Sequence, residues 1–159
     1  MGETVASMRI TAKVDYAIRA AAELGAAPAG VPVKGEALAR AQGIPLRFLE
    51  NILRELRHAG IVRTQRGADG GYQLARPADR VNLADIIRAV EGPLAAVQGE
   101  RPEDLRFDGA ARDLPEVWIA LRANLRSVLE AVTLADLATG RLPRSIRALA
   151  SKPEARKPH

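Results

Sequence analysis

A glycine-rich segment between two short β-prone runs constrains the fold of this chain more than any other feature. Residues 61–66 (IVRTQR) and 72–74 (YQL) alternate between apolar and polar side chains, as the half-buried strands of a hairpin do. The residues between them, 67–71 (GADGG), include three glycines that are free to adopt positive φ. The sequence therefore predicts a β-hairpin with a flexible tip.

Two amphipathic helices directly precede this hairpin. Lys34 to Ala41 is predicted to form a short helix ended by Gly43, and Ile44-Pro45 opens a longer one, with proline in the first turn where its missing N–H costs nothing. The apolar stripe of the longer helix comprises Leu46, Leu49, Ile52, Leu53 and Leu56, before Ala59-Gly60 ends it. A helix-turn-helix followed at once by a hairpin is the order of a winged helix-turn-helix domain.

Two further helices frame this unit. Between Thr11 and Leu24, apolar residues recur at intervals of three and four, which predicts an amphipathic helix. Asn82 to Asp85 resembles a capping box, and it opens a helix that Gly92 ends. We also expect Val31 and Val33 to form a very short strand. The expected fold is mainly α with a small β-hairpin wing, and the DNA-binding domain spans residues 8–92.

The next region divides into a loop and a long helix. Residues 93–112 contain proline, glycine and mixed charges with little periodicity, so they are expected to form a connecting loop. Residues 113–140 are expected to form a dimerisation helix and then a short helix that a second capping box, Thr133 to Asp136, opens. The apolar a/d stripe of the long helix comprises Leu114, Trp118, Leu121, Leu125, Val128 and Val132. Such a stripe packs either on its own domain or on a second copy; we favour the second copy, with Trp118 as an anchor.

Charge is distributed unevenly along the chain. Residues 1–92, 93–140 and 141–159 carry net charges of +3, −3 and +5, and the sequence pI is about 10.2. The last segment holds three prolines and is expected to be a basic, largely disordered tail, which binds phosphates non-specifically or maintains solubility. The positive charge suggests an anionic partner such as nucleic acid.

Composition excludes several classes of function. The chain has no cysteine, so it has no disulfide, thiolate nucleophile, cysteine zinc site or ordinary iron–sulfur cluster. Its two histidines are His58, inside a predicted helix, and His159, the last residue; neither suggests a metal site or a catalytic base. We therefore expect no enzyme activity, no metal and no cofactor. Without a membrane span or a signal peptide, the protein is expected to be cytoplasmic.

The polar face of the second helix carries the chemistry of base recognition. Arg47, Glu50 and Asn51 lie on one face and offer contacts to guanine, cytosine and adenine, respectively. Arg66, at the edge of the glycine-rich tip, is placed to enter a minor groove. The alternative is a merely solvated helix face and an ordinary hairpin. We favour DNA recognition because the turn and the wing flank this helix.

The chain resembles the Rrf2 (Rrf-two) family of winged helix-turn-helix transcriptional regulators, the group that includes IscR, NsrR and CymR. The matching segments, in the family's order, are 13–20 (KVDYAIRA), 48–53 (FLENIL), 56–62 (LRHAGIV), 66–74 (RGADGGYQL), 86–94 (IIRAVEGPL), 117–118 (VW) and 132–137 (VTLADL). The resemblance implies a homodimer with swapped long helices, binding palindromic promoter DNA through the helix-turn-helix and the wing. The order of helix-turn-helix, wing and heptad helix makes a repressor-type regulator of transcription the leading hypothesis. The DNA-contacting residues expected from motifs and resemblance are Arg47, Glu50, Asn51, Arg66, Gly67, Gly70, Gly71, Tyr72 and Lys13. Phe48 stands where the family usually has tyrosine, which leaves it a packing role.

The loop departs from the family pattern. Many relatives carry three cysteines there that hold an iron–sulfur cluster, whereas residues 94–112 have none. We therefore expect no cluster, and the signal stays open among a small-molecule effector, a protein partner and constitutive DNA binding. The competing hypothesis for function is a winged-helix module that binds protein rather than DNA.

Overall fold

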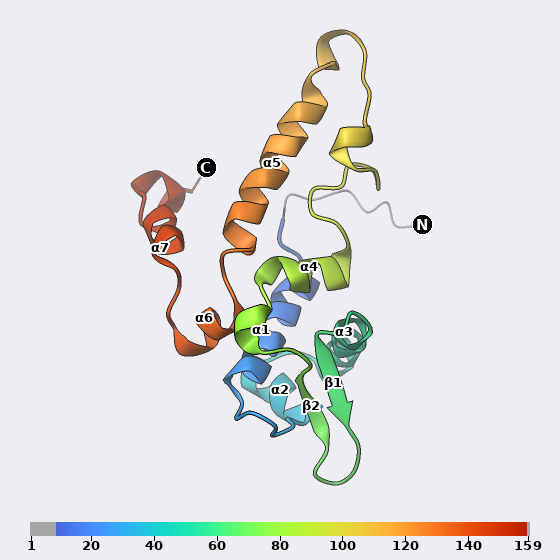
Figure 1. The fold of residues 1–159 in the computed structure, drawn as a ribbon, viewed down its shortest axis with the longest axis vertical. Coiled ribbons are helices and arrows are strands. Elements are labelled where there is room, and N and C mark those ends of the chain that lie inside the picture. Colours follow the sequence, from blue (N-terminus) through green and yellow to red (C-terminus); the bar gives the residue numbers. More distant parts are fainter. Residues whose placement is uncertain (1–8, 159) are drawn as a thin grey trace.

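A computed structural model describes residues 9–158 and divides them into a helical body, an extended arm and a C-terminal helix set to one side (Figure 1). The body contains α1 (Ala12–Ala26), α2 (Gly35–Gln42), α3 (Leu46–His58), β1 (Val62–Gln65), β2 (Gly71–Leu74), α4 (Leu83–Glu91) and α6 (Leu134–Thr139). The arm is α5 (Leu114–Leu129), with the connecting segment beside it, and α7 (Arg144–Ala150) follows the body. The mainly helical fold with a hairpin wing is confirmed. Met8, the expected first residue of the domain, lies outside the described residues.

Small side chains on α1 let the other helices approach it closely. Ala17, Ala20 and Ala21 are fully buried, and α1 packs against α2, α3, α4, α6 and β2. The rest of the core is aliphatic, with Leu38, Leu53, Leu56 and Ile86 almost completely buried. Burial of this apolar surface holds the helix-turn-helix in place.

Local signals set the helix ends where the sequence predicts them. The Thr11 side chain accepts a hydrogen bond from the backbone N–H of Val14 at 3.2 Å and caps α1. The expected capping boxes at Asn82–Asp85 and Thr133–Asp136 are both present, with each side chain bonded to the other residue's backbone N–H. Gly43 ends α2 in a left-handed conformation.

The hairpin of β1 and β2 is extended by one residue from the segment before α2. Val62 pairs with Leu74 and Gln65 with Gly71 in antiparallel register. Val33 adds a single bridge on the outer side of β2, exchanging backbone hydrogen bonds of 2.8 and 2.7 Å with Tyr72. Of the two residues expected to form a very short strand, only Val33 pairs, and the bridge ties the segment before α2 to the wing.

Val132 does not belong to an exposed stripe, which corrects its assignment to the dimerisation face. Helix α5 ends at Leu129, and Val132 is only 3% exposed in its own chain. Its carbonyl accepts a hydrogen bond from the N–H of Leu83 at 3.0 Å, and the N–H of Leu134 donates to Val81 at 2.9 Å. We call this pairing of residues 81–83 with 132–134 the clasp; it brings the chain after α5 back into the core.

The expectation of a disordered tail is wrong for residues 144–150, which form α7. The Arg147 guanidinium donates to the carbonyls of Leu142 and Gly140, and the Ser151 hydroxyl donates to the Arg147 carbonyl. These bonds are local and satisfy backbone groups around a short helix. Among residues 9–158, no helix is long and apolar enough to span a membrane.

Candidate nucleic-acid interface

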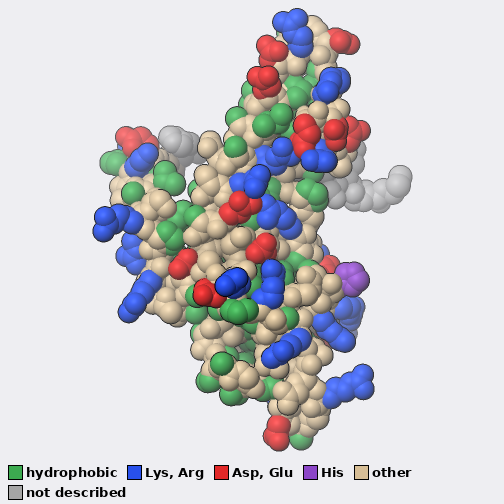
Figure 2. All heavy atoms as spheres, viewed as in Figure 1, with side chains coloured by type: hydrophobic (Ala, Val, Ile, Leu, Met, Phe, Trp, Pro, Cys, Tyr) green, Lys and Arg blue, Asp and Glu red, His purple; other side chains and the backbone are tan. Residues whose placement is uncertain are grey.

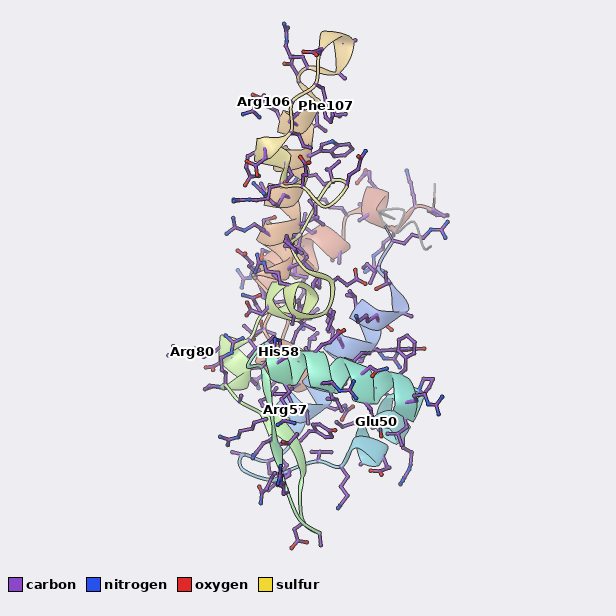
Figure 3. The ribbon with its side chains drawn as sticks, turned by 90° about the vertical axis from the view of Figure 1, so that its right-hand side faces the viewer. Glu50, Arg57, His58, Arg80, Arg106 and Phe107 are labelled. Carbon is purple, nitrogen blue, oxygen red and sulfur yellow. The ribbon has the colours of Figure 1, made fainter. Side chains whose placement is uncertain are left out.

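The outer face of α3 is polar and solvent-exposed. Arg47, Glu50 and Asn51 are all exposed, whereas Leu49 and Ile52 between and beside them are buried. In Figure 3 the Glu50 and Arg57 side chains lie along the lower side of α3, toward the hairpin. The helix therefore presents the three predicted base-reading residues together. The side chain of Asn51 also accepts a bond from Arg54 at 3.3 Å.

A shallow groove of about 200 Å³ separates α3 from the wing. It is lined by Glu50, Leu53, Arg54, Arg57, Thr64 and Tyr72. Figure 2 shows Lys and Arg side chains projecting from this side of the body, near the hairpin and α3. A concave strip with arginine on its floor and rim suits a phosphate backbone, which dominates nucleic-acid affinity.

The wing tip requires glycine at two positions because backbone atoms approach closely. A Cβ on Gly70 would lie 2.1 Å from the carbonyl oxygen of Gln65, and one on Gly71 would lie 2.5 Å from that of Val33. Gly67 has a φ of 102° and accepts a hydrogen bond from Gly70. These glycines bring exposed Arg66 to the edge of a compact turn, as its predicted role needs.

Lys34, the residue before α2, supports the wing, although no sequence pattern indicates this role. Its Nζ donates to the carbonyl of Ala68 at 2.7 Å, so the chain before α2 is tied to the tip as well as to β2. The two residues are 34 positions apart, and no local pattern links them. The only sequence signal was the neighbouring Val33, expected to be in an extended conformation.

Lys13 lies between α1 and α3 and has an ion pair there. Its Nζ is 2.9 Å from Oε1 of Glu55, and its side chain is about one-third exposed. The other oxygen of Glu55 is buried with no hydrogen-bond partner. This geometry gives Lys13 a role in positioning α3, while its direct contact with DNA stays a prediction.

Replacing Lys13 with alanine is expected to lower the free energy of unfolding by about 1 kcal/mol or less, because the pair is partly exposed. Urea unfolding checks this, and a double-mutant cycle with Lys13→Ala, Glu55→Gln and the double variant isolates the pairwise contribution. A positioning role leaves the salt dependence of DNA binding unchanged. A shallower slope of log affinity against log salt in Lys13→Ala would instead show a lost phosphate contact.

Helix α5 carries an uncovered apolar face. None of its residues is buried, and the stripe is only partly shielded at Trp118 and Leu121. Its exposed large apolar residues are Leu114, Val117, Ile119, Leu125 and Val128, with Val117 56% exposed. Apart from Ile119, these residues follow each other at intervals of three or eight and share one face of the helix, and an exposed apolar face of this kind marks an interaction site.

Residues 10–140 match the Rrf2 family, described as iron-dependent transcriptional regulators. The chain belongs to the Rrf2 family. The prediction that it is a transcription regulator and not an enzyme is thereby confirmed. An Rrf2-family relative from Mycobacterium tuberculosis, named as an HTH-type transcriptional regulator, is 49% identical over 143 residues, covering 90% of this chain and 89% of the relative.

Solved Rrf2 structures have the same architecture. The structure of CymR, the global cysteine regulator of B. subtilis, is similar with a TM-score of 0.70 at 33% identity, covering 84% of this chain and 98% of that one. T. potens IscR gives a TM-score of 0.69 at 28% identity, covering 97% and 95%. The suspected family, including its CymR and IscR members, is therefore confirmed.

The iron in the Rrf2 description does not fit the residues of this chain. The sequence has no cysteine, and residues 9–158 contain no group of three His, Asp or Glu side chains that could hold a metal ion. His58 lies exposed at the end of α3 (Figure 3).

The segment that carries cysteines in many Rrf2 relatives is anchored here by other contacts. Leu94, Pro102 and Leu105 are buried, and Arg122 of α5 donates to Glu103 at 2.7 Å. A hydrogen bond from its own backbone N–H and one from Arg122 lower the pKa of Glu103 below its usual 4.5. Beyond these anchors, the segment extends along α5 to Arg106 and Phe107 (Figure 3).

Acidification is expected to loosen this segment from α5. Because the folded-state pKa of Glu103 is lowered, its stabilising contribution is present above the ordinary value and is lost as pH falls through the folded-state pKa. The single tryptophan, Trp118 on α5, reports the change through its fluorescence. Glu103→Gln should remove that part of the pH dependence; an unchanged titration would contradict the assignment.

Proposed function

We propose that this chain is a homodimeric DNA-binding repressor that recognises palindromic promoter DNA through α3 and the wing, in the cytoplasm and without an iron–sulfur cluster. The observation that carries the proposal is the combination of an exposed polar face on α3, a glycine-tipped wing beside it and a long helix with no buried residue. Family membership supports the regulatory role.

In this mechanism, α3 enters the major groove and the wing lies along the adjoining minor groove. Arg47, Glu50 and Asn51 contact base edges, while Arg66 enters the minor groove, where negative potential concentrates. Gly67, Gly70, Gly71 and Tyr72 shape the wing for a close approach. Pairing through α5 places two such heads on half-sites about 34 Å apart, which matches the two-fold symmetry of a palindrome.

Changing Arg66 or Asn51 to alanine is expected to cost about 1–3 kcal/mol of binding free energy at a cognate site. Asn51→Ala should also relax base preference, because it removes direct readout, whereas loss of Arg66 weakens minor-groove contact. Gel shifts on the chain's own upstream region measure both effects, with Arg112→Ala, at an exposed arginine that ends the connecting segment, as the control.

Salt dependence separates this function from a protein-binding module. Affinity for DNA should fall steeply as salt rises because counterions are released from the phosphates. If neither Arg66→Ala nor Asn51→Ala changed affinity, the contact assignments would be wrong. If the intact protein bound no duplex at low salt, the protein-binding module would replace the DNA-binding proposal.

A further inference from the structure

A second cavity, of about 490 Å³, lies where the end of α4, the start of the connecting segment and α5 meet. Its lining shares no residue with the groove between α3 and the wing. Small-molecule sites commonly enclose about 300–1,000 Å³. The cavity is therefore large enough for a metabolite, and it lies apart from the proposed DNA contacts.

Four arginines from three parts of the chain line this cavity. Arg88 comes from α4, Arg101 from the connecting segment, and Arg122 and Arg126 from α5. The lining carboxylates are those of Glu100 and Glu103. Two carboxylates outside the lining also pair with these arginines: Glu130 with Arg88 and Arg126, at 2.7 and 2.9 Å, and Asp85 with Arg88, at 3.9 Å. Figure 2 shows basic side chains gathered where α5 meets the body, with acidic side chains among them.

Most guanidinium N–H groups in the cavity have no protein acceptor. Arg122 donates one hydrogen bond to Glu103, of 2.7 Å. Arg88 and Arg126 each donate one to the same oxygen of Glu130, at 2.7 and 2.9 Å. A guanidinium has five N–H donors in a fixed fork that matches carboxylate and phosphate oxygens. Arg122 is only 26% exposed, so an anion bound there is partly shielded from water.

The rim of the cavity has an unusual backbone. Ala95 and Gln98 adopt positive φ values of 54° and 51°, which residues other than glycine rarely do. Val97, which lies between them, exchanges backbone hydrogen bonds of 2.9 Å with Glu100. Strain of this kind persists where surrounding structure enforces it and is concentrated at ligand sites.

We propose that this cavity binds a small polyanion with two or more carboxylate or phosphate groups, and that the bound anion controls DNA affinity. The second part rests on the proposed function. Arg88 belongs to the DNA-binding domain and Arg122 and Arg126 to the proposed dimerisation helix, so one anion contacts both units. Binding that favours one arrangement of α4 against α5 changes the placement of the two recognition helices, and DNA changes anion affinity by the same factor.

Citrate and pyrophosphate serve as probes of the two anion chemistries. Isothermal titration of the full-length protein, at an ionic strength held constant with sodium chloride, measures binding of each. Arg122→Gln and Arg126→Gln should each weaken binding about tenfold or more, because each removes a charged hydrogen-bond donor. In Arg122→Gln, Glu103 loses its bond to α5, but the buried side chains of Leu94, Pro102 and Leu105 still hold the segment in place.

Arg112→Gln makes the same charge change at a position outside the cavity and should leave binding unchanged. Preference for citrate or for pyrophosphate assigns carboxylate or phosphate as the ligand group. The site is overturned if the wild type binds neither probe, or if all three variants bind alike. Gel shifts without either anion test DNA binding separately: anion binding without DNA binding would refute the proposed function and leave the cavity assignment intact, while DNA binding insensitive to a bound anion would overturn the control.

Discussion

Replacing both Val117 and Leu125 of α5 with glutamate is expected to leave the protein monomeric and to weaken operator binding about 100-fold or more. Within residues 9–158 the apolar face of α5 is only partly covered, and two charges would have to be buried without partners when copies associate. A monomer also loses the high effective concentration with which, in a dimer, the second DNA-binding domain binds once the first is bound. Sedimentation measures the mass, and a gel shift on a palindromic site measures the affinity.

Ala123→Glu is the matched control, because Ala123 is exposed on the same helix but away from the stripe. Its variant should remain dimeric. The far-ultraviolet circular dichroism of the double variant should match that of the wild type, since Val117 is already more than half exposed. A folded double variant that is still dimeric would place the interface elsewhere.

Gly70→Val is expected to abolish specific DNA binding while most of the helical body stays folded. Any Cβ at this position would lie 2.1 Å from the Gln65 carbonyl oxygen. Gln65 is paired with Gly71 in the hairpin, so its carbonyl cannot move away without breaking that pairing. The hairpin must open, which displaces Arg66 and breaks the Lys34 bond to Ala68. Affinity should fall toward the non-specific level, about 1,000-fold weaker than specific binding.

Asp69→Val provides the control, since Asp69 is exposed and belongs to the same tip. It should keep the wing closed and lose little specific affinity. Hydrogen exchange of the strand amides separates the two variants directly: the β1 and β2 amides should exchange faster in Gly70→Val alone. If the β1 and β2 amides of Gly70→Val exchanged as slowly as in the wild type and its affinity for DNA were unchanged, the closed turn would not be needed for the function of the wing.

Elements governed by short-range rules could be predicted from the sequence. Both capping boxes involve residues three apart, and the Gly43 stop depends on the conformation of one residue, so local chemistry decided them. The hairpin was predictable because alternation and glycine act within a dozen residues. The three α3 residues shared a face because helical spacing requires it.

Features that depend on long-range packing could not be predicted. Val132 continues the apolar spacing of α5, but the helix ends three residues earlier and the clasp draws Val132 into the core. Lys13 and Glu55 are 42 positions apart, as are Arg88 and Glu130. The arginine-lined cavity arises only when α4 and α5 are brought together, and no periodicity marks its members.

The clasp has a consequence for the spacing of the operator. Because residues 132–134 bond to residues 81–83, the C-terminal end of α5 is tied to the start of α4. For a given state of the arginine-lined cavity, α5 therefore keeps one orientation relative to the recognition unit. In the proposed dimer, the two reading heads then have a fixed phase around the duplex axis. One inserted base pair between half-sites turns the second half-site by about 36°. Inserting one base pair should therefore weaken binding more than substituting one base pair in the same spacer. Inserting a whole helical turn restores the phase but not the distance between half-sites, so it should not restore binding by a rigid dimer.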